Sequence, residues 1–309
     1  MLTGRLGHAV GKASRTKTDV HRRDRIAAQR AVERRREQQR RLFIAGGAVL
    51  AVIVIVVAFV LVKANSHSSN VAGGASNGPT GAALTSVVND VTKVPAATLD
   101  KAGDGGSSLS SAIKPITAAA LTSNGKPEIF YDGAEYCPYC AAARWGMVVA
   151  LSRFGTFTGL KTVHSSTTDS PANIPTWTFY GSTYTSKYVT FTPVEETTNV
   201  PDANGYTPLQ TPTAAQQALV KANDPNGSIP FIDYGGKYVQ VGDLPMLGPS
   251  NLSGTWSKIA SDLKDPTSAN GKAILSAANF TTAAICELTG NQPASACTAT
   301  VKGLESQLK

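Results

Sequence analysis

Apolar and polar positions divide the chain into stretches of different character. Residues 42–62 are an apolar run without a charge, which at about 1.5 Å per residue extends roughly 31 Å, the thickness of a bilayer's hydrocarbon core. This run predicts a transmembrane helix. Residues 63–82 hold mostly Ser, Gly, Asn and Ala, too little apolar mass to fold, and predict a flexible linker. Over residues 83–309, apolar residues recur at helix and strand spacings, which predicts a folded domain.

The pattern in this domain predicts helices that alternate with strands. A segment dense in β-formers, 127–133, ends at Gly133, and apolar residues at helical spacing follow it over 141–155. The other predicted strands lie over 161–166, over 176–199 with a turn at Gly181-Ser182, and over 229–242 as a β-hairpin that turns at Gly235-Gly236. The other predicted helices lie over 85–94, 213–224, about 252–264 and 272–290, with a short one at the C-terminus. Such alternation predicts an α/β architecture in layers.

Positive charge is concentrated at the N-terminus. Residues 1–41 carry 13 Lys/Arg and 4 Asp/Glu, a net +9, so the rest of a chain with a formal charge of +8 sums to −1. A basic segment can bind nucleic acid, or it can set membrane topology and lie against anionic lipid headgroups. No aromatic residue is interleaved and no recognised nucleic-acid-binding fold fits in this length, so we predict a basic cytoplasmic tail and no nucleic-acid partner.

The charges that flank the apolar run predict its orientation. Arg40 and Arg41 precede it and Lys63 alone follows, so the positive-inside rule places residues 1–41 in the cytosol and the domain outside, on a single-pass cell-membrane protein. A cleaved signal peptide is the alternative, because Val62-Lys63-Ala64 loosely fits a cleavage site. The run is longer than a usual signal-peptide core and 41 residues precede it, which favours an uncleaved anchor in the lipid bilayer.

Two of the four cysteines, Cys137 and Cys140, form a Cys-Pro-Tyr-Cys motif between a predicted strand and a predicted helix. A cysteine at a helix N-terminus has a lowered pKa, since unpaired N–H groups and the helix dipole favour the thiolate. Pro138 suits the first helical turn because its missing N–H needs no partner there. Cys140 follows one turn later, at the spacing that lets a second thiol release a mixed disulfide. We therefore predict Cys137 as the nucleophile and Cys140 as the resolving thiol.

Two other roles are open to this pair: a structural disulfide and half of a zinc site. Zinc would need Cys286 and Cys297 as well, but these stand eleven residues apart and no histidine lies nearby, so no metal is predicted. Outside the membrane an even number of cysteines favours pairing. We expect Cys286 and Cys297 to form a structural disulfide between two C-terminal helices, with a second redox pair as the alternative.

Two motifs resemble the thioredoxin superfamily. "YDGAEYCPYCAAARWG" resembles its active site, with the dipeptide typical of glutaredoxins, and "GSIPFIDYGGKYVQVG" resembles the segment in which a cis-proline precedes a β-hairpin. The resemblance implies that Pro230 is a cis-proline that faces the cysteine pair. It also implies that Ile229 presents its backbone to a client peptide by strand-like pairing.

A closer resemblance is to a family of membrane-anchored thioredoxin-like proteins catalogued as a domain of unknown function. It rests on "EYCPYCAAARWGMVVALSRFG" with the later cysteine pair and covers roughly residues 85–309. It implies a thioredoxin-like fold, a central mixed sheet flanked by helices, with an insertion and C-terminal helices after one transmembrane helix. The 92 residues between Cys140 and Asp233 exceed the minimal fold, so residues 166–215 are the predicted insertion.

The surroundings of the motif depart from the thioredoxin pattern. Many thioredoxins have a buried acid six residues before the first cysteine, where this chain has Tyr131. Asp132 is expected on the opposite face of the strand, and Glu135 is expected to be exposed in the connector. Arg144 is expected beside the active-site helix, where its charge would favour the Cys137 thiolate. His164 is assigned no role. Four residues at helical spacing are expected in the core: Trp145, Met147, Val148 and Leu151.

These features together predict a membrane-anchored, extracytoplasmic thiol–disulfide oxidoreductase without a cofactor. Its expected partners are client proteins with thiols or disulfides and a membrane protein that exchanges electrons with it. The sequence does not decide between oxidase, reductase and isomerase. The alternative is a non-catalytic binding or assembly module of the cell envelope that keeps the fold, because a fold does not establish a function.

Overall fold

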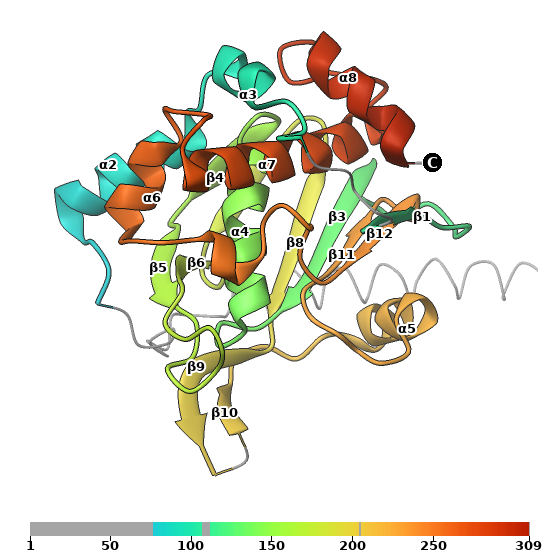
Figure 1. Ribbon diagram of the computed structural model, residues 1–309. Helices are drawn as coiled ribbons and strands as arrows, with labels where there is room; N and C mark the ends of the chain where they lie inside the picture. The colour runs from blue at the N-terminus through green and yellow to red at the C-terminus, as the bar shows by residue number, and fades with distance from the viewer. Residues whose placement is uncertain (1–76, 107–111, 204, 309) are drawn as a thin grey trace, which may run out of the picture. The chain divides into compact units, whose positions relative to one another are not determined.

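A mixed β-sheet with helices on both faces forms the centre of the structure, a computed structural model that describes residues 77–106, 112–203 and 205–308 (Figure 1). Contacts divide the chain between Val71 and Ala72, and every described residue lies in the second unit. The predicted tail, the predicted membrane span and linker residues 63–76 lie outside the described residues. Within the described ranges, no helix is long and apolar enough to cross a membrane.

The sheet is built around β3 (Lys126–Gly133). On one side β8 (Thr190–Glu195) runs parallel to it, with Tyr131 opposite Pro193. On the other side β11 (Phe231–Tyr234) is antiparallel to it, and β12 (Tyr238–Val241) is antiparallel to β11. Two short strands complete the sheet: β1 (Ile113–Pro115) pairs with β12, and β2 (Thr122–Ser123) pairs with the start of β3.

Side chains alternate between two apolar layers because β3 and β11 are covered on both faces. Ile129, Tyr131, Ile232 and Tyr234 belong to the large core that holds α4 (Pro138–Leu151) and α7 (Ala269–Leu288). The opposite face has a smaller core, made by Phe130, Val194, Phe231 and Val239 with Leu219 and Val220 of α5 (Ala214–Asn223). Helices α4 and α7 thus lie on one face of the sheet and α5 on the other.

Helix α4 is buried at every residue except Tyr139, and this agrees with its nearly uniform apolar sequence. It begins at Pro138, directly after Cys137 as predicted, and the predicted core residues Trp145, Met147, Val148 and Leu151 are all buried. Gly146 allows close approach of the neighbouring chain, because a Cβ there would lie 3.1 Å from a Leu247 methyl carbon and 3.4 Å from the Ala277 Cβ. α4 and α7 therefore pack tightly against each other.

The predicted hairpin over 229–242 is confirmed, and Gly235 and Gly236 both adopt the positive φ that its turn requires. The predicted turn at Gly181-Ser182 is also present, between β6 (Pro175–Thr178) and β7 (Thr183–Ser186). These two strands do not pair with each other. β6 pairs with β5 (Lys161–His164), and β7 pairs with β4 (Gly155–Thr158).

The predicted insertion over 166–215 is wrong as a single block. β8 lies in its middle and belongs to the main sheet, whereas the predicted strand over 161–166 lies in the small β5–β6 sheet. A strand was predicted here, within 176–199, but its place in the main sheet was not, because nothing in the segment Thr-Phe-Thr-Pro-Val-Glu indicates that it pairs with β3. Proline is tolerated there since β8 pairs only with β3 among the described strands, and is therefore an edge strand. The strands that lie outside the main sheet are β4–β7 and the hairpin of β9 (Thr197–Asp202) and β10 (Gly205–Pro208).

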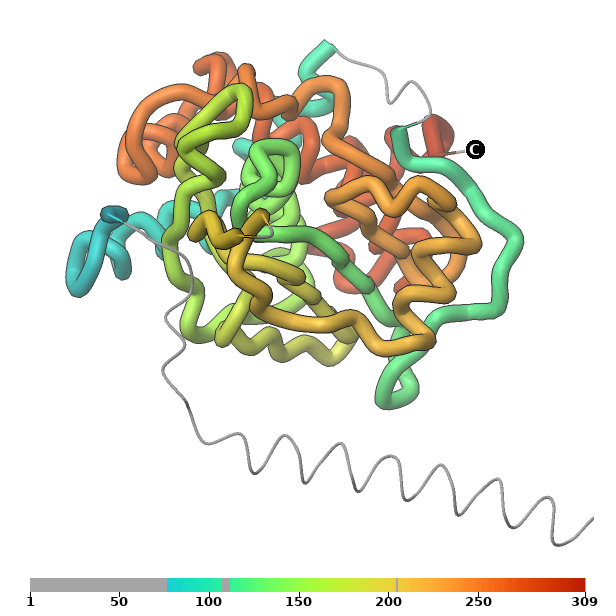
Figure 2. Tube along the Cα trace, turned by 90° about the horizontal axis from the view of Figure 1, so that it is seen from below, coloured from blue at the N-terminus to red at the C-terminus, as the bar shows by residue number. Residues whose placement is uncertain are grey.

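Short helices surround this centre: α2 (Gly81–Thr92), α3 (Ala96–Ala102), α6 (Trp256–Asp262) and α8 (Ala299–Glu305), with 3-10 turns over Pro249–Asn251 and Ser306–Leu308. α2 begins two residues inside the predicted linker, and its Val87 and Val91 are buried in the large core. The predicted disulfide between Cys286 and Cys297 is present, and joins the end of α7 to the residues that precede α8. The β9–β10 hairpin lies at the end of the molecule where α4 begins (Figure 1, Figure 2).

Candidate active site

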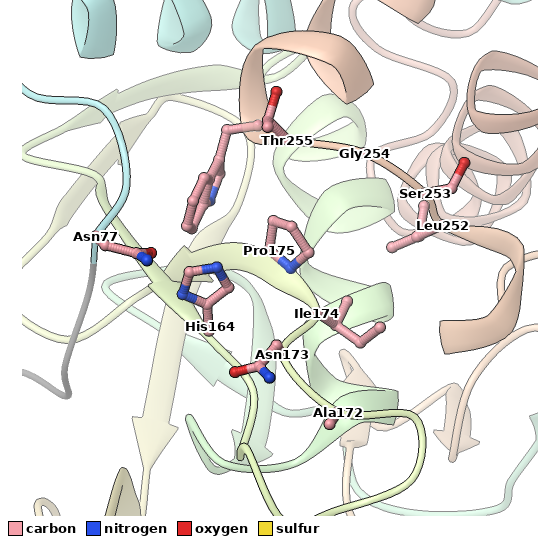
Figure 3. A pocket seen from close by; sticks show the side chains of 11 residues that line it. Asn77, His164, Ala172, Asn173, Ile174, Pro175, Leu252, Ser253, Gly254 and Thr255 are labelled. Atoms are coloured by element: carbon pink, nitrogen blue, oxygen red, sulfur yellow. The ribbon is translucent and has the colours of Figure 1, made fainter.

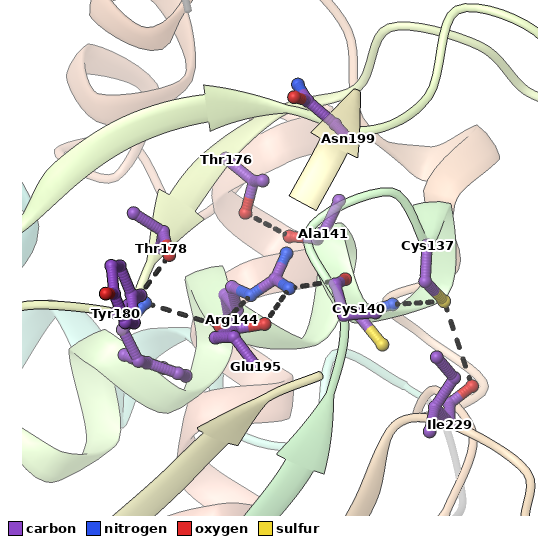
Figure 4. A network of polar contacts seen from close by, with 12 residues as sticks. Cys137, Cys140, Ala141, Arg144, Thr176, Thr178, Tyr180, Glu195, Asn199 and Ile229 are labelled. Atoms are coloured by element: carbon purple, nitrogen blue, oxygen red, sulfur yellow. Dashed lines mark hydrogen bonds and ion pairs between the residues drawn. The ribbon is translucent and has the colours of Figure 1, made fainter. Parts of the chain in front are cut away.

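Cys137 and Cys140 lie together at the N-terminus of α4. Cys137 is the N-cap residue, with extended backbone angles, and its Sγ accepts a hydrogen bond from the Cys140 N–H at 3.3 Å (Figure 4). Pro138 occupies the first turn, as predicted. Both cysteines are free thiols, but only Cys137 reaches the surface: it is 5% exposed, and Cys140 is fully buried. The local geometry therefore distinguishes an outer thiol from an inner one.

The loop ahead of β11 brings Ile229 and Pro230 to this helix terminus. Their peptide bond is cis, as the resemblance implied, and the Sγ of Cys137 lies 3.8 Å from the carbonyl oxygen of Ile229 (Figure 4). Residues that are 92 positions apart are thus in contact. The structure brings together all four residues predicted for the redox and peptide-binding site.

The two thiols have opposite pKa shifts. The pKa of Cys137 is lowered, chiefly by the hydrogen bond from the Cys140 thiol, and further by the Cys140 N–H and the Arg144 charge, which together outweigh burial. The pKa of Cys140 is raised well above its ordinary value by burial, and next by its hydrogen bond to Cys137 and the charge there. Since the thiolate is the nucleophilic form, this pattern favours attack by Cys137.

A buried ion pair lies one helical turn beyond Cys140. Arg144 donates from Nε to the Glu195 Oε1 at 2.9 Å and from Nη2 to Oε2 at 2.6 Å, and Nη2 also donates to the Ala134 carbonyl oxygen at 2.6 Å (Figure 4). Neither side chain of the pair is exposed. A lone arginine in an apolar helix signals a buried partner, but no pattern in the sequence identifies Glu195, 51 residues away.

The connector between β3 and α4 corrects one expectation. Glu135 was expected to be exposed, but it is fully buried. The reason is that the chain after β8 covers the connector: the Glu135 N–H donates to the Thr197 carbonyl oxygen at 2.9 Å, and the Glu196 N–H donates to that of Gly133 at 2.7 Å. These bonds continue the β3–β8 pairing past the end of β8 and enclose the connector.

Tyr131 and Asp132 lie on opposite faces of β3, as expected. The Tyr131 ring is in the large core, 5.9 Å from the Arg144 guanidinium carbon, and its buried hydroxyl has no hydrogen-bond partner. Asp132 is 4% exposed, and its Oδ1 also lacks a partner. Burial raises the pKa of Asp132 to about 7, with a further contribution from the charge of Glu196. Neither residue reproduces the buried acid of the thioredoxin pattern.

Two stacked tyrosine rings connect the β9–β10 hairpin to the connector between β3 and α4. The rings of Tyr136 and Tyr206 lie 4.2 Å apart and 6° from parallel. Ser166 holds both, because its N–H donates to the Tyr136 carbonyl oxygen at 2.7 Å and its Oγ accepts from the Tyr206 hydroxyl at 2.6 Å. Tyr139, between the two cysteines, is 45% exposed. Aromatic side chains therefore flank the only thiol of the pair that reaches the surface.

Comparison with known proteins identifies a family. A family model described as Domain of unknown function (DUF929) matches residues 113–209 and 204–287, more than half of the chain. The chain belongs to this family. No curated protein and no solved structure matches it. The matched residues of the DUF929 domain include Cys137, Cys140, Ile229, Pro230 and Cys286.

The DUF929 domain also has a cavity of about 440 Å³ that none of these site residues lines (Figure 3). His164 and Trp256 line it, with ring centroids 4.4 Å apart. Burial lowers the pKa of His164, and the Trp256 indole N–H already donates to the Thr176 carbonyl oxygen. The contacts of His164 are those of a packed side chain.

A zinc site made by all four cysteines is not formed, because Cys286 and Cys297 are bonded to each other. Across residues 77–106, 112–203 and 205–308, no group of three His, Cys, Asp or Glu side chains is placed to hold a metal ion. The chemistry that the DUF929 site offers is that of a dithiol in which one sulfur, that of Cys137, has a lowered pKa and a small exposed fraction.

Proposed function

We propose that this chain is a thiol–disulfide oxidoreductase with a thioredoxin-like fold. The order of its central elements supports the fold: β3–α4–β8 makes a βαβ unit, α5 crosses over, and β11–β12–α7 makes a ββα unit. The strand order β12-β11-β3-β8, with α4 and α7 on one face and α5 on the other, resembles the thioredoxin arrangement. The added elements β4–β7 and β9–β10 lie outside this framework.

One observation carries the proposed activity: the Sγ of Cys137 contacts both the Cys140 N–H and the Ile229 carbonyl oxygen. The first contact stabilises a thiolate. The second places the sulfur beside a backbone carbonyl that a client peptide can pair with as an added strand. A purely structural dithiol needs neither an activated sulfur nor an adjoining peptide-binding edge.

The reaction proceeds by two exchanges. The Cys137 thiolate attacks one sulfur of a client disulfide, forms a mixed disulfide, and releases the other client sulfur as a thiolate. This removes the negative charge at Cys137, one of the causes that hold up the pKa of Cys140. The Cys140 thiolate then attacks the Cys137 sulfur and releases the second client thiolate, which takes up the proton that Cys140 lost. The dithiol gives two electrons to the client, and the reverse sequence oxidises a client dithiol.

The compartment is part of the proposal. The Cys286–Cys297 disulfide supports an oxidising environment, where such bonds persist. The apolar run over 42–62 and the basic residues before it support an N-terminal anchor with the domain outside the cytosol. A membrane partner would then restore the dithiol or the disulfide after each turnover. Protease added to intact spheroplasts should digest the domain and spare the tail, and a protected domain would overturn this orientation.

Insulin reduction by the full-length chain in mild detergent tests the activity. We expect catalysis above the rate of a matched Cys137→Ser variant. Equal rates for the wild type and Cys137→Ser would rule out the proposed enzymatic activity and favour the alternative, a non-catalytic binding or assembly module. The direction of electron flow needs a second measurement, the redox state of Cys137 and Cys140 trapped by alkylation in living cells. A disulfide there indicates an oxidase, and a dithiol indicates a reductase.

A further inference from the structure

A second cavity, of about 250 Å³, opens on the α5 face of the sheet beside the proposed peptide-binding residue. Its walls come from the end of β3, the residue after β8, α5, and the loop that leads to Ile229. Ile229 lines it, together with these polar residues: Asp132, Glu196, Gln217, Lys221, Asp224 and Asn226. Small-molecule sites typically occupy about 300–1,000 Å³, so this cavity suits a single side chain better than a free ligand.

The charges that line the cavity are unbalanced. Asp132, Glu196 and Asp224 contribute carboxylates, and Lys221 is the one cationic residue among the lining residues. Asp224 is already satisfied in part, because its oxygens accept the N–H groups of Asn226 and Ser228. The remaining carboxylates, those of Asp132 and Glu196, favour a cation in the cavity.

Asp132 marks the place where that cation would be held. It lines the cavity, is 4% exposed, and has an Oδ1 that accepts no hydrogen bond. A buried carboxylate oxygen without a donor is costly, and an incoming N–H group removes that cost. Burial and the Glu196 charge together raise the pKa of this carboxyl to about 7, and a bound cation would favour its ionised form.

The cavity is next to the reacting sulfur through a shared residue. Ile229 lines the cavity, and its carbonyl oxygen is the atom that contacts the Cys137 Sγ. A client peptide that pairs with the backbone here has its cysteine at Cys137, so a neighbouring side chain can enter the cavity.

We propose that this cavity is a specificity subsite for a basic side chain, Lys or Arg, that lies close to the reacting cysteine of a client protein. The inference rests on the proposed redox function and adds a substrate preference to it. An ammonium or guanidinium group supplies the donors that Asp132 lacks and offsets the acidic lining.

The test is a rate comparison with the full-length Cys140→Ala variant in non-ionic detergent. The probes are short peptides with one cysteine, activated as a mixed disulfide with thionitrobenzoate. They differ only in an Arg, Gln or Glu at one position, and that position is moved through the residues on both sides of the cysteine. Cys137 displaces coloured thionitrobenzoate. We expect one position at which the Arg peptide reacts about tenfold faster than the Glu peptide.

Charge-removing variants locate the effect. Asp132→Asn or Glu196→Gln should bring the Arg-to-Glu ratio close to one, and because both peptides are measured on the same variant, a change in its overall rate cancels in this ratio. Glu128→Gln is the matched control, because it removes a carboxylate from the same face of β3 at the opposite end, and it should leave the ratio unchanged.

Two failures are distinguishable. The subsite is refuted and the redox function stands if the peptides react with Cys137 but show no charge preference at any position. The same conclusion follows if Asp132→Asn and Glu196→Gln both leave the preference intact. If no peptide reacts faster than with a Cys137→Ser/Cys140→Ala variant, the redox function itself fails and the subsite fails with it.

Discussion

Arg144 and Glu195 form a two-fold hydrogen-bonded ion pair with no exposed side-chain surface, one helical turn beyond Cys140. The pair fixes a positive charge near the thiols, and this charge contributes to the lowered pKa of Cys137. Desolvation of two charges offsets much of their attraction, so the pair need not add net stability. Removal of one partner, however, leaves the other charge buried alone.

The first prediction follows from this asymmetry. Arg144→Met should lower the free energy of unfolding by about 3–5 kcal/mol, because Glu195 then stays buried without a cation beside it, although the Phe179 N–H still donates to its Oε1. The double variant Arg144→Met/Glu195→Leu should recover most of the loss, since it removes both charges. Denaturant unfolding of the two variants and the wild type measures this. A double variant as unstable as the single one would show that packing, rather than charge, is what the pair supplies.

The second prediction concerns the thiol that attacks. The alkylation rate of Cys137 should rise with pH, with a midpoint below that of a free cysteine thiol. In Cys140→Ala the midpoint should move upward, because the hydrogen bond from the Cys140 thiol is the largest cause of the lowering. Mass spectrometry of the labelled peptide follows each cysteine separately. A Cys137 midpoint at or above that of a free thiol would contradict the site geometry.

The parts of the site that the sequence predicts are those with local signals. Pro138 after Cys137 indicates a helix start, and Gly235-Gly236 indicates a hairpin turn just after Pro230. Each signal depends on a few neighbouring residues. The contact between the two segments was available only through the resemblance to thioredoxins, because no spacing rule connects Cys137 to Ile229 across 92 residues.

The features that were missed depend on distant partners. β8 falls within the strands predicted over 176–199, but its place in the main sheet was missed, because that place depends on pairing with the distant β3. Glu135 is buried because the chain after β8 covers it, and Glu195 is buried because Arg144 pairs with it. In all three cases a tertiary contact, and not the local sequence, decides where the residues lie. Charged residues in a strand or connector look exposed until the partner that encloses them is known.

The third prediction is a pH dependence at Asp132, whose pKa is raised from 3.8 to about 7 by burial. Between these values the unfolded chain has lost the proton that the folded chain keeps, so stability falls as pH rises. At about 1.4 kcal/mol per pH unit, this shift in the pKa of Asp132 corresponds to roughly 4 kcal/mol in the free energy of unfolding. Asp132→Asn should therefore match the wild type near pH 4 and exceed its stability by up to about 4 kcal/mol at pH 8.

Unfolding curves recorded at several pH values give the difference between Asp132→Asn and the wild type directly. Shifts that the two proteins share, such as that of Asp233, cancel in this difference. A difference that is flat across pH would show that Asp132 ionises normally in the folded protein.

The fourth prediction separates the second cysteine pair from the first. Cys286→Ala should lower the free energy of unfolding by about 2–4 kcal/mol, because the link between α7 and the residues before α8 is lost. Insulin reduction at a temperature where the variant stays folded should be unchanged. A loss of catalysis without a loss of stability would instead make this pair an electron relay.

The most direct test of the central claim is the capture of reaction intermediates by Cys140→Ala in living cells. Cys137 can then attack client disulfides, but no inner thiol is present to release it, so disulfide-linked complexes should accumulate and dissolve on reduction. Cys137→Ala should capture far less, since the helix-terminal sulfur with the lowered pKa is gone. Non-reducing gels of the two variants beside the wild type give the answer. Equal capture by both variants, or none by Cys140→Ala, would contradict the assignment of Cys137 as the nucleophile that Cys140 resolves.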